Sequence, residues 1–396
     1  MSLPLEGVRI LAVSQFGAGP YGTMMLAELG AEVIKIEDPA VGGDVSRSVP
    51  PYTIEHDSLY FQSFNRNKKS ITLNLKSPEG KEIFHRLVKV SDAVFNNLRG
   101  DQVGKLGLDY NSLKGVNPKI VCCSLVGFGR SGARSGEPGY DYLMQAYAGY
   151  MSITGDPATP PTACGVSVID HAAGFAAGLG LVAALYGASK TGNGCDVEVS
   201  LLDTAVSMLT YLAIWNLNQG FTPVRRPGSA HQTLVPVQTF RTSDGYIVIF
   251  CAKERFWQNL CEALGIPEAA EVEEFRNFAQ RHKNRELIVS KLQAIFSTKT
   301  TGAWVALLRG KVPCAPVNDL SQALADPFLH ERHMIVETDH PHFGRIKQVA
   351  SPIKISDSEI IHRRAPQLGE HTTEILKDHL GMPESEVQQL RQKGIV

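Results

Sequence analysis

Asp170 is the residue whose type and position in this chain most clearly suggest chemistry. It lies in the segment GVSVIDHAAGFAAGLG (165–180) and begins a long apolar run with no basic residue until Lys190. A carboxylate at a buried helix start is costly unless backbone amides or a ligand charge compensate it. Aspartate is also a common helix N-cap. The residues alone therefore leave two roles open, a reactive carboxylate and a helix cap.

A glycine-rich turn near the N-terminus, GAGPYG (17–22), could bind a phosphate-containing ligand. It matches the dinucleotide fingerprint G-x-G-x-x-G, follows an apolar strand and opens a helix. Glu37 then ends the next strand, as the fingerprint requires. Alone, this segment indicates an NAD(P)-binding oxidoreductase. The rest of the sheet lacks a recognisable set of hydride-transfer residues, so that activity stays an alternative.

The composition argues against several other functions. The seven cysteines form no C-x-x-C pair, so neither dithiol redox chemistry nor a metal site is expected. The net charge of −1 gives no basic excess for nucleic acid. The N-terminus lacks a secretion signal, and the longest apolar run, 175–188, is too short to span a bilayer. We therefore expect a cytoplasmic protein that binds neither nucleic acid nor a membrane.

Alternating strands and helices predict an α/β fold with a parallel sheet covered by helices. Apolar strands are expected at 8–13, 31–37, 92–96 and 119–125, and helices at 21–30, 78–90, 109–115 and 139–150. A glycine-rich loop, SLVGFGRSGARSGEPGYD (124–141), follows the last of these strands. Loops at the carboxyl ends of parallel strands are where such proteins build their sites.

The character of the sequence changes near residue 215. A strand pair joined at Ser243-Asp244-Gly245 and helices at 254–264, 284–296 and 300–309 predict a smaller α+β domain over 225–325. The large domain then occupies 1–215. A last segment, 326–396, contains proline-rich stretches and a helix at 370–380.

Five segments resemble, in order, landmarks of the class III CoA-transferases, the family of formyl-CoA and carnitine CoA-transferases. The match covers nearly the whole chain. It rests on LEGVRILAVSQFGAGPYGTMMLAELGAEVIKIE (5–37), SLYFQSFNRNKKSITLNLKSPEGKEIF (58–84), GYDYLMQAYAGYMSITG (139–155), the Asp170 segment and PQLGEHTTEIL (366–376). The resemblance implies a Rossmann-like large domain completed by 326–396, and a homodimer of two interlocked rings.

The resemblance also implies a reaction and gives Asp170 a part in it. A CoA-transferase moves the thioester of an acyl group between two carboxylic acids, and a carboxylate nucleophile suits such acyl transfer. Asp170 stands where the family has its catalytic aspartate. It would form a mixed anhydride and then an aspartyl-CoA thioester. Amides near Gly17–Ala18 and in the 225–232 loop are candidates for stabilising the tetrahedral intermediates.

Coenzyme A would take part as substrate and product, with no further cofactor. The positions that match the family's CoA-binding residues are Phe16, Gly17, Ala18, Leu73, Lys76, Asn97, Leu98, Lys105 and Tyr140. Two departures, Asp38 for an arginine and Gly17 for a glutamine, argue against formate or oxalate as the acid. Lys68 and Lys69 are additional candidates for phosphate contacts.

Two further activities fit the same resemblance. Acyl-CoA racemases share the fold and use a histidine where this chain has Tyr140, in GYD rather than GHD. A phenol is a poor base at neutral pH, and His171 does not share a helical face with Asp170. A protein that binds CoA without turnover is the other alternative.

The segment RRPGSAHQTLVPVQTF (225–240) resembles the loop of transferases that act on dicarboxylates. Arg225, Arg226 and His231 could hold the distal carboxylate of such a substrate, and Arg47 is a second candidate for that task. We expect succinyl-CoA as the donor and a C4–C6 dicarboxylate as the acceptor.

Overall fold

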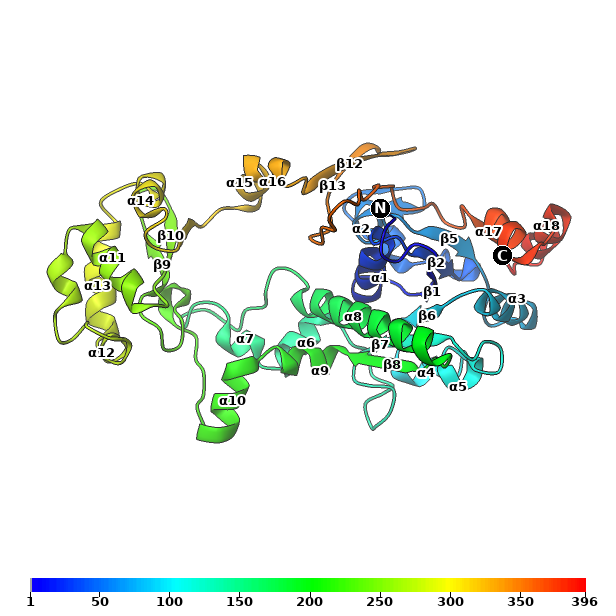
Figure 1. The fold of residues 1–396 in the computed structure, drawn as a ribbon, viewed down its shortest axis with the longest axis horizontal. Helices are drawn as coiled ribbons and strands as arrows, with labels where there is room; N and C mark the ends of the chain where they lie inside the picture. Colours follow the sequence, from blue (N-terminus) through cyan, green and yellow to red (C-terminus); the bar gives the residue numbers. More distant parts are fainter. Residues whose placement is uncertain (1) are drawn as a thin grey trace. The chain divides into compact units, whose positions relative to one another are not determined.

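The computed structural model describes residues 2–396, and the chain divides into two compact units (Figure 1). The first unit contains the residues up to Ala148, then Gly165–Leu209 and Phe328–Val396. The second contains Gly149–Cys164 and Thr210–Pro327. The sequence analysis placed domain boundaries near residues 215 and 326. It assigned the short segment 149–164 to the large domain, whereas in the structure this segment belongs to the second unit.

A six-stranded parallel sheet forms the centre of the first unit, in the order β5-β2-β1-β6-β7-β8. The strands are β1 (Arg9–Val13), β2 (Glu32–Glu37), β5 (Lys69–Thr72), β6 (Ala93–Asn96), β7 (Val121–Val126) and β8 (Asp196–Ser200). The chain leaves β1 toward β2 on one side and later adds β6 on the other. In open α/β sheets, ligands bind at the carboxyl ends of strands where the order reverses in this way.

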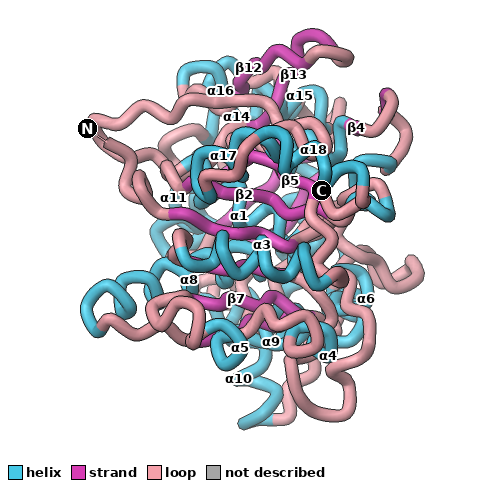
Figure 2. Tube along the Cα trace, turned by 90° about the vertical axis from the view of Figure 1, so that its right-hand side faces the viewer, coloured by secondary structure: helices cyan, strands magenta, loops and turns pink. Residues whose placement is uncertain are grey.

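Helices cover both faces of this sheet because its strands are apolar on both sides. On one face, α3 (Pro78–Lys89), α17 (Thr372–Leu380) and α18 (Glu384–Gln392) share one buried core with the strands (Figures 1 and 2). On the other, α1 (Ala18–Glu28) packs against α8 (Val168–Thr191), which also contacts β7. Neighbouring Cys122 and Cys123 are both buried, as expected for small core residues.

Helix α8 is longer than the apolar run seen in the sequence. Its 24 residues are long and apolar enough, by length and composition, to cross a membrane. In this structure Ile169, Ala173, Ala177 and Leu181 are fully buried along one side of the helix. The side that packs on α1 and β7 is thus a core face of the first unit.

The expected helix 139–150 is two helices, α6 (Asp141–Tyr147) and α7 (Tyr150–Ile153). Gly149 lies between them with a φ of +85°, which ends the first helix. The sequence analysis also missed α18 and a hairpin of β12 (Ile335–His340) and β13 (Gly344–Val349). The remaining elements of the first unit are β3 (Thr53–Ile54), β4 (Asp57–Ser58), α2 (Leu59–Phe64), α4 (Gly100–Val103), α5 (Tyr110–Leu113), α9 (Leu201–Ser207) and α16 (Pro327–Glu331), which begins at the boundary.

The second unit contains a three-stranded antiparallel sheet in the order β11-β10-β9. The expected Asp-Gly turn joins β9 (Val237–Arg241) to β10 (Tyr246–Phe250), and β11 is Cys314–Pro316. Trp257, Phe296 and Trp304 are buried in its core. Besides α7, its α-helices are α10 (Thr210–Gln219), α11 (Glu254–Leu264), α12 (Phe278–Lys283), α13 (Arg285–Phe296), α14 (Thr301–Leu308) and α15 (Leu320–Leu324).

Candidate active site

Asp170 is the third residue of α8, but its side chain does not cap the helix. The N-cap residue Ser167 makes no capping bond with its side chain. The carboxylate of Asp141 accepts hydrogen bonds from the amides of Ile169 (2.7 Å) and Asp170 (3.2 Å) instead. The capping alternative for Asp170 is therefore wrong, since Asp141 has that role. Within residues 2–396, no group donates a hydrogen bond to the Asp170 carboxylate.

The environment of Asp170 disfavours its charged form. Burial, and then the nearby Asp141 carboxylate, raise the pKa of Asp170 from 3.8 to about 7. A carboxylate without hydrogen-bond donors is also a better nucleophile than a solvated one. Strongly shifted carboxylates of this kind concentrate at reactive sites. The geometry and the electrostatics thus favour the reactive role.

The start of α1 lies directly against this carboxylate. A Cβ atom placed on Gly17 would come within 3.0 Å of Asp170 Oδ2 and 3.9 Å of the Tyr60 hydroxyl. Gly17 is the N-cap residue of α1, and no side chain caps this helix. The amides of Ala18 and Gly19 are therefore among the unpaired N–H groups that begin every helix. Such groups stabilise negative charge next to them.

Two glycines hold the two helices close together. A Cβ on Gly22 would lie 2.6 Å from the carbonyl oxygen of Gly174, and one on Gly174 would lie 2.7 Å from that of Ala18. No real Cβ fits at such distances. The separation between Gly17 and Asp170 is therefore set by a backbone-to-backbone contact.

Aromatic rings surround the same place. The Phe16 ring meets the rings of Tyr60 and Tyr140 edge-to-face, with centroids 5.8 and 6.4 Å away. Burial, followed by the charges of Asp170 and Asp44, raises the pKa of Tyr60. The sequence analysis missed Tyr60, because nothing in SLYFQ distinguishes it from a core aromatic residue.

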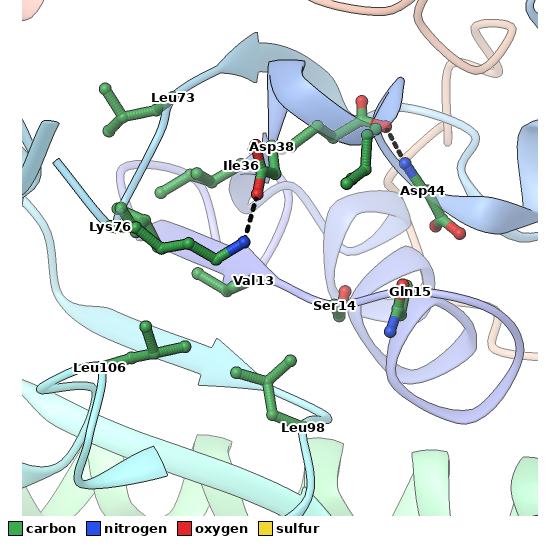
Figure 3. A pocket seen from close by; sticks show the side chains of 14 residues that line it. Val13, Ser14, Gln15, Ile36, Asp38, Asp44, Leu73, Lys76, Leu98 and Leu106 are labelled. Carbon is green, nitrogen blue, oxygen red and sulfur yellow. Dashed lines mark hydrogen bonds and ion pairs between the residues drawn. The ribbon is translucent and has the colours of Figure 1, made fainter. Parts of the chain in front are cut away.

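A cleft with a volume of about 270 Å³ opens at the carboxyl ends of β1, β2, β5 and β6 (Figure 3). It lies where the strand order reverses, which is the usual ligand position in an open α/β sheet. The loop 124–141, where the sequence suggested a site, does not line it. The expected CoA-binding residues Leu73, Lys76 and Leu98 line it. Its other lining residues are Val13, Ser14, Gln15, Ile36, Glu37, Asp38, Val41, Gly43, Asp44, Leu75 and Leu106.

The lysines that were expected to contact CoA or its phosphates already have partners. Lys76 Nζ lies 3.0 Å from Asp38 Oδ2 across the cleft and is largely exposed (Figure 3). Lys105 forms an ion pair with Asp101 at 2.8 Å. Lys69 lies between Glu32 and Glu374. Lys68 is fully buried and donates to the carbonyls of Pro20 and Phe64, so it is not available to a phosphate.

Arg47 is likewise not available to hold a substrate carboxylate, contrary to expectation. Only 1% of it is exposed. Its Nε and Nη2 atoms donate to the two oxygens of Glu37 at 2.8 Å each, and its guanidinium stacks on the ring of Phe61. The sequence GGDVSRSVPPY gives no sign of this partner, which comes from strand β2.

In the second unit, Arg225 and His231 both make internal contacts. Arg225 Nη1 donates to the carbonyls of Asp156, Thr159 and Pro160, which fixes that segment. His231 Nδ1 accepts from the amides of Thr233 and Leu234, and its Nε2 faces the Tyr211 hydroxyl at 3.3 Å. The ring is thus held neutral, and burial followed by Arg285 lowers the pKa of His231.

Arg226 and Arg285 differ from Arg225 because each keeps unused donors. Arg226 Nε and Arg285 Nη1 are buried without a hydrogen-bond partner. Arg285 Nη2 donates to the carbonyls of His231 and Gln232 (2.9 and 3.2 Å). In the part of the chain that the structure describes, no carboxylate pairs with either arginine. Burial, and then Arg226, lower the pKa of Arg285 to about 10. The sequence analysis missed Arg285, which lies far along the chain.

The ring of His171 packs on Tyr21, with centroids 4.6 Å apart, and on Phe64. Burial lowers its pKa. Within residues 2–396, no three His, Cys, Asp or Glu side chains are grouped so that they could hold a metal ion.

Comparison with known proteins gives a consistent result. A family model described as CoA-transferase family III matches residues 5–372. The chain is 35% identical to the succinyl-CoA:glutarate CoA-transferase of Homo sapiens over 395 residues, 99% of this chain and 90% of that protein. It is 36% identical to the succinyl-CoA:mesaconate CoA-transferase of Haloarcula marismortui over 384 residues, 94% and 96% of the two chains. A solved CAIB/BAIF family protein from Brucella suis matches with a TM-score of 0.82 and 32% identity, over 96% of this chain and 100% of that one.

Proposed function

Because the chain belongs to CoA-transferase family III, we propose that Asp170 is the group that carries the acyl chain and then coenzyme A between two carboxylic acids. The observation that supports this most is the Asp170 carboxylate itself. It accepts no hydrogen bond from the described residues, lies against the free amides that begin α1, and has a raised pKa. The racemase, oxidoreductase and binding-only alternatives lack such a supporting observation.

The proposed reaction has four steps that consume no water. Asp170 Oδ attacks the carbonyl carbon of the donor thioester, the C–S bond breaks, and CoA leaves as a thiolate. The thiolate attacks the Asp170 carboxyl carbon, which releases the donor acid and leaves an aspartyl-CoA thioester. The acceptor carboxylate then attacks that thioester and frees the thiolate again. Finally, the thiolate takes the acyl group of the acceptor from the anhydride and restores Asp170.

Each step passes through a tetrahedral intermediate with a negatively charged oxygen. The amides of Gly17, Ala18 and Gly19 are the groups we assign to this charge. Removing one such donor typically costs about 3–4 kcal/mol of transition-state stabilisation. The rings of Phe16, Tyr60 and Tyr140 would limit the access of water, which would otherwise hydrolyse the anhydride.

Coenzyme A is the substrate we assign to the cleft at β1, β2, β5 and β6, with no additional cofactor. Leu73 and Leu98 offer apolar surface there, and Lys76 offers a cation once it leaves Asp38. Phe16, Gly17, Ala18, Lys105 and Tyr140 remain proposed contacts that rest on the family resemblance.

The proposed acids are succinate, delivered as succinyl-CoA, and a C4–C6 dicarboxylate. The human and Haloarcula relatives are named for such acids. In the second unit, Arg226 and Arg285 have buried donors without a partner and pair with no carboxylate of the described residues, so we propose that they bind a carboxylate of the acid. Arginine binds a carboxylate through two parallel hydrogen bonds, which selects for that group over a methyl end.

A panel of acids tests both the activity and this assignment. With succinyl-CoA, we expect new CoA esters of glutarate or another dicarboxylate, read by mass spectrometry. In Arg226→Gln and Arg285→Gln, kcat/KM for dicarboxylates should fall about 10²-fold, because the substrate carboxylate loses the guanidinium group that would bind it. Monocarboxylates should lose much less.

The control for this panel is Arg276→Gln, which removes an exposed arginine of the same unit that pairs with Glu273. It should leave both classes of acid unchanged. Equal losses for mono- and dicarboxylates would remove Arg226 and Arg285 from acid recognition. No ester with any acid, despite CoA binding, would contradict the transfer activity.

We also propose that the protein is a homodimer. Large apolar side chains are exposed on helices of both units, among them Leu179 and Tyr186 in α8 and Ile214 and Leu217 in α10. Apolar surface of this kind is typical of an interface. Sedimentation at micromolar concentration should give twice the 43.1 kDa mass of the chain; a sedimenting monomer would contradict the dimer.

The cytoplasm is the compartment that we propose. No disulfide joins any of the seven cysteines, all of which lie within the described residues 2–396. Reduced thiols are the usual state in that compartment.

A further inference from the structure

The short loop between β1 and α1, residues 14–17, has an unusual backbone. Phe16 has a φ of +67°, in the left-handed region that non-glycine residues rarely adopt. Such a conformation is strained and persists only where neighbouring groups enforce it. Two side chains from other segments of the chain, Asn97 and Asp44, make contacts that do so here.

Asn97, which follows β6, holds the residue before Phe16 from both sides. Its Oδ1 accepts from the amide of Gln15 at 2.8 Å, and its Nδ2 donates to the carbonyl of Gln15 at 2.7 Å. Asn97 also packs on the first turn of α1, since a Cβ on Gly19 would lie 2.8 Å from the Asn97 Cβ. Both polar ends of its amide group are therefore committed to the loop.

Asp44 holds Phe16 itself. Its Oδ1 accepts from the amide of Phe16 at 3.1 Å, and its Oδ2 pairs with Lys35 Nζ at 2.7 Å. Lys35 Nζ also donates to the carbonyl of Ser14. The side chains of Lys35 and Asp44 are at most 1% exposed. The dashed line at Asp44 in Figure 3 marks the hydrogen bond that its amide donates to the Glu37 carboxylate.

These contacts use the amides of Gln15 and Phe16 and the carbonyls of Ser14 and Gln15. The amides at the start of α1 stay free in the described structure, and they begin at Gly17, against Asp170 Oδ2. We propose that Asn97 and Asp44 are positioning residues, which hold these amides where the tetrahedral intermediates form on Asp170. This inference rests on the proposed function, and it replaces the family-implied role of Asn97 as a direct CoA contact.

The test separates these two roles of Asn97. In Asn97→Ala, kcat for exchange between succinyl-CoA and glutarate should fall about 10–10²-fold, because a misplacement of about 1 Å in a reacting group can cost that much. The Kd of CoA, measured by calorimetry, should stay within twofold of wild type. A Kd raised tenfold with an unchanged kcat would instead identify Asn97 as a CoA contact and overturn the proposal.

Asn117→Ala is the matched control, because Asn117 clamps a loop in the same way at the opposite ends of the strands. Its side chain donates to the carbonyls of Val88 and Ser91 and accepts from the amide of Lys119. It should keep wild-type kcat; an equal loss there would attribute the Asn97→Ala effect to general destabilisation. If Asn97→Ala folds poorly, Asn97→Asp keeps the acceptor for the Gln15 amide but sets an oxygen against the Gln15 carbonyl, and it should lower kcat to a similar extent.

Failure of the proposed function would appear in the wild-type protein. Hydroxylamine trapping with succinyl-CoA alone should label the peptide that contains Asp170. An unlabelled wild type during exchange would overturn Asp170 acylation, and with it the basis of this inference. Equal labelling rates in wild type and Asn97→Ala would overturn only the positioning role.

Discussion

Asp170→Asn is expected to lower kcat at least about 10³-fold while CoA still binds, because the amide that replaces the carboxylate is not a nucleophile and cannot form the anhydride. The Asp141 cap on the first turn of α8 does not involve the Asp170 side chain and stays intact. Exchange between succinyl-CoA and glutarate measures the rate, and calorimetry measures CoA affinity. Activity above one-tenth of wild type would contradict a covalent role for Asp170.

The same variant should be more stable than wild type at neutral and higher pH. The folded pKa of Asp170, about 7, is above its unfolded value of 3.8. As the pH rises from about 4 to 7, the unfolded chain ionises first, so wild type loses stability over that window. Asparagine avoids this loss, which is at most a few kcal/mol. Thermal unfolding should therefore give equal Tm values near pH 4 and a higher Tm for Asp170→Asn at pH 8.

If the higher Tm of Asp170→Asn disappears at acid pH, the stabilisation comes from removing a buried charge. A general effect on packing would not depend on pH in this way. A lower Tm for Asp170→Asn at pH 8 would mean that the carboxylate stabilises the fold. The result would then favour a structural role for this residue. Stability given up at a reactive group is a common feature of enzyme sites.

Gly174→Ala should produce the second large effect, on both stability and rate. Its new methyl group would lie 2.7 Å from the carbonyl oxygen of Ala18 and 3.1 Å from the amide of Gly22. Neither backbone group can rotate away, so α1 must move from α8, and overpacking of this kind costs about 1–3 kcal/mol. Because Gly17 moves with α1, kcat should fall about 10–10²-fold. The rate of exchange between succinyl-CoA and glutarate measures kcat, and thermal unfolding measures the change in stability.

Gly178→Ala is the control, since Gly178 lies one turn further along α8. A Cβ there has its nearest neighbour, Leu26 Cδ2, at 4.0 Å, which is an ordinary contact. It should keep kcat within twofold and the Tm of wild type. Wild-type kcat in Gly174→Ala would show that the two helices do not set the position of the amides.

The parallel sheet and the position of Asp170 could be predicted because their signals are local. Apolar strands, glycine punctuation and alternation with helices occur within short windows. The helix that carries Asp170 was visible for the same reason. The break at Gly149 was missed, since a glycine within an apolar helical pattern is common and only the positive φ reveals the stop.

The polar contacts could not be predicted, because each depends on a partner from a distant segment. Arg47 reads as an exposed arginine until Glu37 is placed beside it on β2. Asn97 matches a CoA-binding position of the family, and its hydrogen bonds to both the amide and the carbonyl of Gln15 are visible only in the structure. Arg285 is separated from His231 by 54 positions, and no periodicity connects them.

The two units hold different parts of the proposed assignment. The helix pair and the loop next to Asp170 belong to the first unit, whereas Arg226 and Arg285 belong to the second. Under that assignment, substitutions around the two arginines are expected to change which acid is accepted and to leave the acyl-transfer step at Asp170 unchanged.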